Sequence, residues 1–135
     1  MGDAVNLGSR LESLTKIYGV PIIVSEFTKA QVPEFAYREL DVVRVKGKDK
    51  PVTIYEPICE ILQLDKATKD NLRLYDEALK HYRNQNWDLA EMQLINLQKL
   101  EPQRAVYDLY IKRIAHFRET PPADHWDGVF NYDSK

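Results

Sequence analysis

Residues 2–12 read Gly-Asp-Ala-Val-Asn-Leu-Gly-Ser-Arg-Leu-Glu, and they are predicted to begin a helix that continues to about residue 18. At a helical advance of about 100° per residue, Asn6 and Arg10 are four positions apart and share one face. A second face, roughly a quarter turn away, carries the apolar residues Ala4, Leu7, Leu11, Leu14 and Tyr18. Gly19 is a typical stop signal. The helix therefore offers one side for packing against a sheet and a neighbouring side with an amide and a fixed cation.

The residues after this helix predict a small α-β-α-β-β unit. The apolar, β-branched run 21–25 is typical of a strand buried on both faces, and a brief helix is expected over 25–32. Two strands are expected at 36–46 and 51–59. The Gly-Lys-Asp-Lys turn at 47–50 would join them as an antiparallel hairpin.

The second half of the chain has helical periodicity in three segments, roughly 66–84, 87–100 and 103–118. Its middle part resembles a tetratricopeptide repeat at Ala78, Trp87, Ala90, Leu94, Leu97 and Pro102. Only one full repeat and a further helix fit, so a helical cap is expected rather than a solenoid. Trp126, in the tail, is expected to pack back onto the protein.

Composition limits the classes of function. The 135 residues carry a net charge of −2, with 44% hydrophobic and 30% charged residues. No apolar run approaches the roughly 20 residues of a membrane span, and no basic block suggests nucleic acid. Cys59 is the only cysteine, which excludes an internal disulfide. With no signal peptide apparent, a cytoplasmic location is expected, alternatively as the cytoplasmic part of a membrane sensor. No metal site is predicted at the histidines, His81, His116 and His125.

Two runs resemble the C-terminal part of the catalytic domain of class III adenylate/guanylate cyclases. They are GDAVNLGSRLESLTKIYGVPIIVSE at 2–26 and RELDVVRVKGKDKPVTIYEP at 38–57. The Asn-x-x-x-Arg helix, the Tyr-Gly-Val-Pro strand start and the Val-Lys-Gly-Lys hairpin tip occur in the family's order and spacing. The expected fold is α+β, a partial ferredoxin-like cyclase unit followed by three tetratricopeptide-like helices. The expected domains are the cyclase part at 1–60, a linker at 61–69 and a helical extension with a Pro/Trp-containing tail at 70–135.

The resemblance implies a role for three residues in making a cyclic nucleotide from a nucleoside triphosphate. Arg10 would stabilise the charge that builds on the phosphate in the transition state, Asn6 would position the ribose, and Lys46 would meet the terminal phosphates. The alternative is a purely local role. Asn6 and Arg10 would then pair with Glu12 or Glu39, and Lys46 would only solvate a turn.

The resemblance also implies that catalysis needs residues from a preceding part of the catalytic domain. The family's Mg²⁺-binding aspartates and base-reading residues precede the matched part, so no bound metal or other cofactor is expected here and the chain alone is expected to be inactive. ATP is the expected substrate of the parent enzyme, and GTP is the alternative. Family members work as head-to-tail dimers, so a homodimer is expected. No contact of this chain with nucleic acid or a membrane is expected, although a preceding segment could anchor the parent enzyme in a membrane. A different hypothesis is a non-catalytic interaction module that uses the helical extension.

Overall fold

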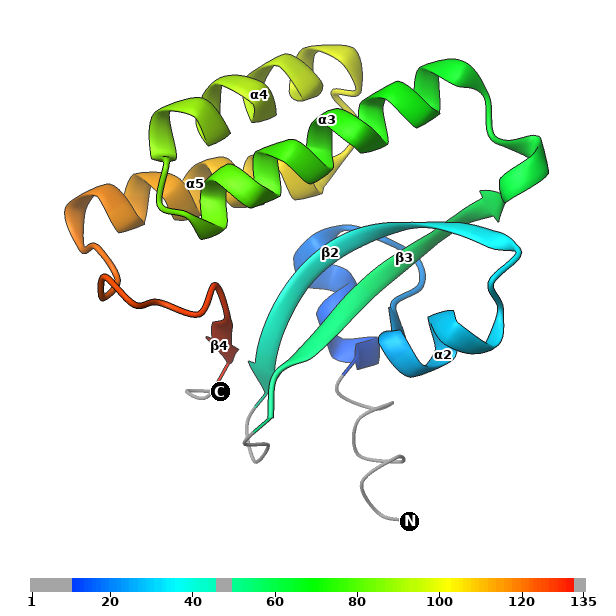
Figure 1. Ribbon diagram of the computed structural model, residues 1–135, viewed down its shortest axis with the longest axis horizontal. Coiled ribbons are helices and arrows are strands. Elements are labelled where there is room, and N and C mark those ends of the chain that lie inside the picture. Colours follow the sequence, from blue (N-terminus) through cyan, green and yellow to red (C-terminus); the bar gives the residue numbers. More distant parts are fainter. Residues whose placement is uncertain (1–10, 46–49, 133–135) are drawn as a thin grey trace. The chain divides into compact units, whose positions relative to one another are not determined.

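The computed structural model describes residues 11–45 and 50–132. Its contacts divide the chain into two compact units (Figure 1). The sheet unit contains the described residues up to Leu64 together with the segment that begins at Val129, and the helical unit runs from Asp65 to Gly128. The contacts thus group the segment after Gly128 with the sheet. The division at 60 and 70 drawn from the sequence stays a prediction.

Among the described residues, four strands form the sheet, in the order β1-β3-β2-β4. They span Val24–Ser25 (β1), Phe35–Val45 (β2), Val52–Glu60 (β3) and Phe130–Tyr132 (β4). β2 and β3 pair antiparallel along most of their length, which confirms the predicted hairpin strands. With the helices described below, the fold is α+β, as the sequence predicts. β4 runs parallel to the last three residues of β2, so a strand from the far end of the chain lies at one edge of the sheet.

The strand expected over 21–25 is shorter than predicted. Only Val24–Ser25 pair with β3, and β1 lies at the edge of the sheet. Ile22 is 54% exposed, so the expectation of a strand buried on both faces is wrong. A short apolar run next to an edge looks the same in sequence as a central strand. The brief helix that follows is confirmed as α2 (Glu26–Gln31), and the Ser25 side chain caps it by accepting from the Thr28 N–H.

The first helix is described over residues 11–18, and it ends where the sequence predicts. Gly19 has a φ of +69°, in the left-handed region that glycine adopts without strain. The Val20 N–H donates to the Thr15 carbonyl at 3.1 Å, the hydrogen bond of a Schellman C-cap. The helix buries three of its predicted apolar positions, Leu11, Leu14 and Tyr18.

A β-bulge interrupts the pairing of β2 with β3. Glu39 lies opposite Tyr55 and Asp41 lies opposite Ile54, so Leu40 is an extra residue in β2. Leu40 and Asp41, although adjacent, are both fully buried. A simple alternation of buried and exposed side chains therefore does not hold at this point of the strand.

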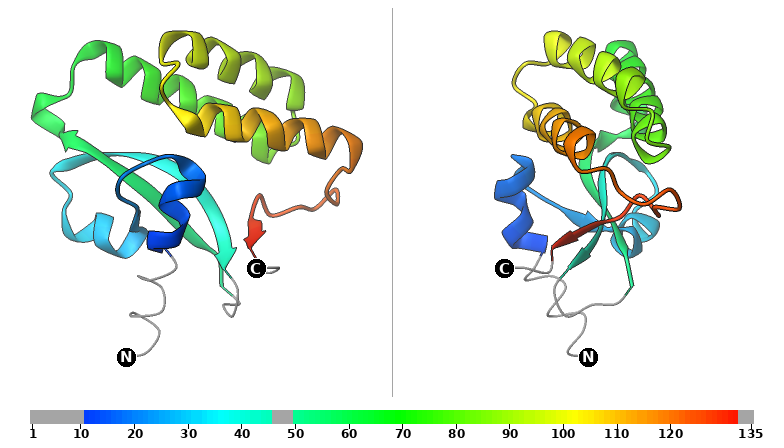
Figure 2. Two further views of the ribbon diagram at one scale, coloured as in Figure 1. Left: turned by 180° about the vertical axis from the view of Figure 1, so that it is seen from behind. Right: turned by 90° about the vertical axis from the view of Figure 1, so that its left-hand side faces the viewer.

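The helical unit consists of α3 (Lys66–Arg83), α4 (Trp87–Leu100) and α5 (Ala105–Glu119), in agreement with the three predicted segments. α3 packs against α4, and α4 packs against α5 (Figure 2). Ala78 on α3 and Ala90 on α4 are both fully buried, as expected of small residues where two helices approach closely. Arg118 on α5 binds Asp88 and Glu91 on α4 at 2.7 and 2.8 Å.

An aromatic cluster closes one end of the helical unit. The Trp126 ring lies 5.4 Å from Tyr82, 6.2 Å from Trp87 and 5.3 Å from Phe117, measured between ring centroids. Edge-to-face and tilted contacts of this kind are favourable beyond the area they bury. The prediction that Trp126 packs back onto the protein is confirmed. Within the described residues, no helix combines the length and apolarity that crossing a membrane requires.

Candidate functional site

The three site residues predicted from the sequence, Asn6, Arg10 and Lys46, lie outside the described residues. The structure describes the elements next to them in the chain. The described part of the helix starts at Leu11, the residue after Arg10, and β2 ends at Val45, one residue before Lys46. The predicted roles of the three residues therefore stay predictions.

The neighbouring elements point to one end of the sheet unit. In Figures 1 and 2 the described helix (dark blue) begins at the same end of the sheet unit at which β2 stops and β3 starts. β4 also lies at this end, because its three residues pair with Val43, Arg44 and Val45 of β2. The Arg44 side chain donates to the Asn131 side-chain carbonyl at 2.7 Å.

A buried hydrogen bond ties the helix to β2. The Tyr18 hydroxyl donates to Asp41 Oδ2 at 2.5 Å, and both residues are fully buried. The other carboxyl oxygen of Asp41 accepts from the Val42 backbone N–H at 2.8 Å. Because a buried polar pair has one strongly preferred geometry, this bond fixes the helix at 11–18 relative to β2. The bulge at Leu40 places Asp41 in this buried position.

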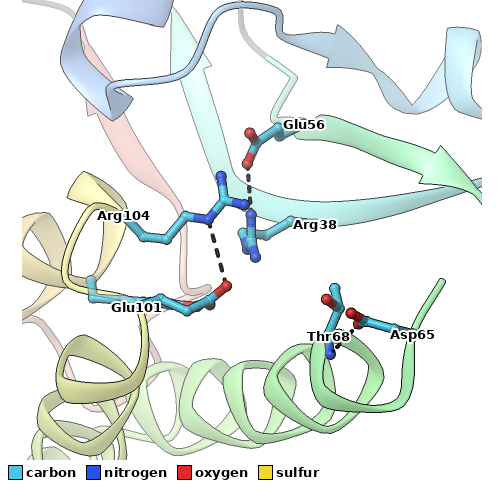
Figure 3. Close-up of polar contacts among 7 residues, drawn as sticks. Arg38, Glu56, Asp65, Thr68, Glu101 and Arg104 are labelled. Carbon is cyan, nitrogen blue, oxygen red and sulfur yellow. Dashed lines mark hydrogen bonds and ion pairs between the residues drawn. The ribbon is translucent and has the colours of Figure 1, made fainter.

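Arg38 and Glu56 form a second buried polar pair in the sheet unit (Figure 3). Arg38 Nη1 lies 2.8 Å from Glu56 Oε1, and the exposed fractions of the two side chains are 0% and 8%. The two residues are directly opposite in the register of β2 and β3. A guanidinium so deeply buried does not present its charge to a ligand from solution. The pair is therefore a structural contact between β2 and β3 rather than a ligand-binding site.

The expectation that the magnesium ligands lie in a preceding part of the catalytic domain stays a prediction. Across residues 11–45 and 50–132, no three side chains of His, Cys, Asp or Glu come together to hold a cation. Carboxylates with altered acidity belong to the start of α3 instead. Hydrogen bonds from Thr68 hold the pKa of Asp65 below its usual range (Figure 3), and a hydrogen bond from Lys66 does the same for the pKa of Asp70. Both carboxylates are accessible to solvent: Asp65 is the N-cap of α3, and Asp70 pairs with Lys66 and Arg73 on the surface of the helix.

Reasoning from the sequence missed both buried pairs of the sheet unit. The available signal was a charged residue within each predicted strand, Arg38 or Asp41 in one and Glu56 in the other, among apolar and aromatic neighbours. Opposite charges on two strands of a hairpin are candidates for a cross-strand pair. The bulge at Leu40 shifts the register, however, so counting back from the turn does not place Arg38 opposite Glu56.

Known proteins similar to this chain are adenylate cyclases. The chain is 40% identical over 88 residues to the terminal-differentiation specific adenylate cyclase of Dictyostelium discoideum, a match that takes 62% of this chain and 4% of that protein. It is 48% identical over 60 residues to the adenylate cyclase of Anabaena cylindrica, with 42% of this chain and 12% of that protein matched. For adenylate cyclase 1 of Rhizobium meliloti strain 1021 the identity is 37% over 59 residues, covering 43% of this chain and 9% of that protein.

The chain therefore contains a region related to adenylate cyclases, and it spans only between 4% and 12% of the length of these curated relatives. No family model and no solved structure matches it. The Dictyostelium match also reaches the helical unit. A match over 62% of a 135-residue chain includes most of β3 and α3 wherever it is placed.

Proposed function

We propose that residues 1–60 are the C-terminal part of the catalytic domain of a class III nucleotide cyclase, which converts ATP to cyclic AMP and pyrophosphate. The observation that carries the proposal is the 48% identity over 60 residues to the Anabaena cylindrica adenylate cyclase. The resemblance of the Asn-x-x-x-Arg helix and the Val-Lys-Gly-Lys tip to the class III family supports it. GTP remains the alternative substrate.

In this proposal Asn6 and Arg10 carry the chemistry that the chain contributes. As the ribose 3′ oxygen attacks the α-phosphate, negative charge grows on the phosphate oxygens. A guanidinium stays protonated and binds two oxygens at once, so Arg10 would stabilise that charge. Asn6, four residues earlier on the predicted helix, would orient the ribose. Lys46 would bind the terminal phosphates. The first described turn of the helix and the end of β2 lie at one end of the sheet unit, which supports this grouping.

We expect the chain to have no cyclase activity by itself. The resemblance places the two metal-binding aspartates and the base-selecting residues in a preceding part of the catalytic domain. We therefore assign no magnesium ligand in this chain. A homodimer, with the head-to-tail arrangement that the resemblance implies, is part of the same proposal.

A chimeric enzyme tests the proposal. The C-terminal part of the catalytic domain of the Anabaena cylindrica adenylate cyclase would be replaced by residues 1–60, and cyclic AMP would be measured from ATP. We expect the chimera to be active and the isolated chain to be inactive. The proposal fails if the chimera folds, with a thermal transition like that of the parent enzyme, but makes no cyclic AMP. Cyclic AMP made by the purified isolated chain would contradict the expectation that the chain needs the rest of the domain.

A further inference from the structure

One face of α4 combines exposed apolar residues with two opposite charges. Four large side chains are 38–61% exposed: Leu89, Met92, Ile95 and Leu100. Asp88 and Lys99 lie on the same face, and the Asp88 side chain is 94% exposed. At a helical advance of about 100° per residue, all six fall within an arc of about 140°. The opposite face of α4 is buried through Ala90, Leu94 and Leu97.

This face is complementary to itself. When two identical helices pack antiparallel about a two-fold axis, two residues at equal distances on either side of the crossing point come together. For a crossing at the middle of α4, three pairs meet this condition to within about one residue: Asp88 with Lys99, Leu89 with Leu100, and Met92 with Ile95. One pair is oppositely charged and the other two are apolar.

We propose that two copies of this chain associate through their α4 helices, antiparallel about a two-fold axis that crosses near the middle of the helix. Met92 of each copy packs on Ile95 of the other at the centre, and Leu89 packs on Leu100 along one flank. Asp88 and Lys99 form two equivalent ion pairs at the ends. The charges also set the direction, because a parallel pair would place like charges beside each other.

The size of the face sets the strength of the association. A helix of 14 residues is about 21 Å long, so a single helix pair is smaller than a standard specific interface. A dissociation constant between micromolar and millimolar is therefore expected. Added salt should weaken the dimer, because it screens the exposed ion pairs.

Sedimentation equilibrium of the full chain over this range of concentration tests the interface. Met92→Glu would bring carboxylates into its apolar centre, and we expect it to raise the dissociation constant by about a hundredfold or more. The matched control is Phe27→Glu on α2, where a side chain that is 71% exposed lies in the sheet unit. The control should leave the dissociation constant unchanged.

Charge reversal tests the antiparallel direction. Asp88→Lys and Lys99→Asp each set like charges against each other, and each should weaken the dimer about tenfold. The double variant exchanges the two charges and should restore the wild-type constant. Asp88 also binds Arg118 in its own chain, but the double variant lacks that bond as well. Recovery would therefore report the contact between copies.

Each outcome of these experiments either supports the α4 interface or overturns it. A dimer that weakens in each single variant and recovers in the double variant supports the α4 interface. A chain that stays monomeric at millimolar concentration overturns it. So does a dimer that is insensitive to Met92→Glu, since that dimer would use another surface, and so does a double charge variant that stays weak. Far-UV circular dichroism of each variant checks that the helices are retained.

Discussion

At the scale of single residues, the sheet unit depends on charged groups that are removed from solvent. Arg38 and Glu56 face each other across the hairpin with their side chains almost fully buried. A buried ion pair gains little over a well-packed apolar pair, but a single buried charge left behind is strongly unfavourable. The consequence of a substitution therefore depends on whether one partner or both are replaced.

Replacing one partner should cost far more than replacing both. We expect Glu56→Leu to lower the free energy of unfolding by about 3–5 kcal/mol, because it removes the carboxylate that lies 2.8 Å from the buried Arg38 guanidinium. The double variant Arg38→Met with Glu56→Leu should recover most of this loss. Urea unfolding of both variants measures the difference. Equal losses in the single and double variants would show that the pair does not contribute in this way.

Asp65, the N-cap of α3, gives the helical unit a dependence on pH. Its carboxylate accepts hydrogen bonds from Thr68, including the backbone N–H at 2.9 Å, and these bonds hold its pKa below the unfolded value. A lowered pKa in the folded state means that the stabilisation is complete above the unfolded pKa of about 3.9. It is lost as the pH falls through the lower folded pKa.

Asp65→Asn should remove this pH-dependent contribution to the free energy of unfolding, because asparagine does not titrate but is still a good N-cap. Below about pH 4, the free energy of unfolding of the wild-type chain should fall more steeply with decreasing pH than that of the variant. At neutral pH the two proteins should differ little. Urea unfolding between neutral pH and about pH 2 gives the two slopes. Identical slopes would exclude a contribution from this carboxylate.

At the scale of elements, the connection from the helical unit to β4 passes through a position that needs glycine. Gly128 has a φ of +79°, and a Cβ added there would lie 2.9 Å from the Arg83 Cγ atom. Gly128→Ala should lower the free energy of unfolding by about 1–2 kcal/mol, from backbone strain and this close contact. Asp124→Ala, at an exposed position in the same tail, is the control and should change stability by less than about 0.5 kcal/mol. Equal stability of the two variants would contradict the strain argument.

Elements specified by nearby residues could be predicted from the sequence, and elements specified by distant ones could not. The ends of the first helix and of α2 follow from Gly19 and Ser25, whose capping bonds are formed within a few residues. β4 pairs with a strand more than eighty positions earlier in the chain, and no local pattern indicates that partner. The bulge at Leu40 likewise depends on how two strands fit together.

At the scale of the whole molecule, a cyclase-related region is followed by a helical unit whose first helix shares in the Dictyostelium match. The family resemblance was accessible from the sequence because three motifs occur in one order and spacing. The geometry of the site was not, because a motif specifies residue types and not the distances between them. Asn6, Arg10 and Lys46 also lie outside the described residues, so their grouping rests on the elements beside them.

The most direct test of the proposed chemistry is the turnover of ATP by the chimeric cyclase with and without the Arg10 guanidinium. We expect Arg10→Ala to lower kcat by about a hundredfold or more and to change KM little, as for a group that acts mainly in the transition state. Arg44→Ala removes a guanidinium from β2 at the same end of the sheet unit, at a residue with no role in the proposed chemistry, and should leave kcat nearly unchanged. If the two variants turn over ATP at the same rate, Arg10 does not stabilise the transition state.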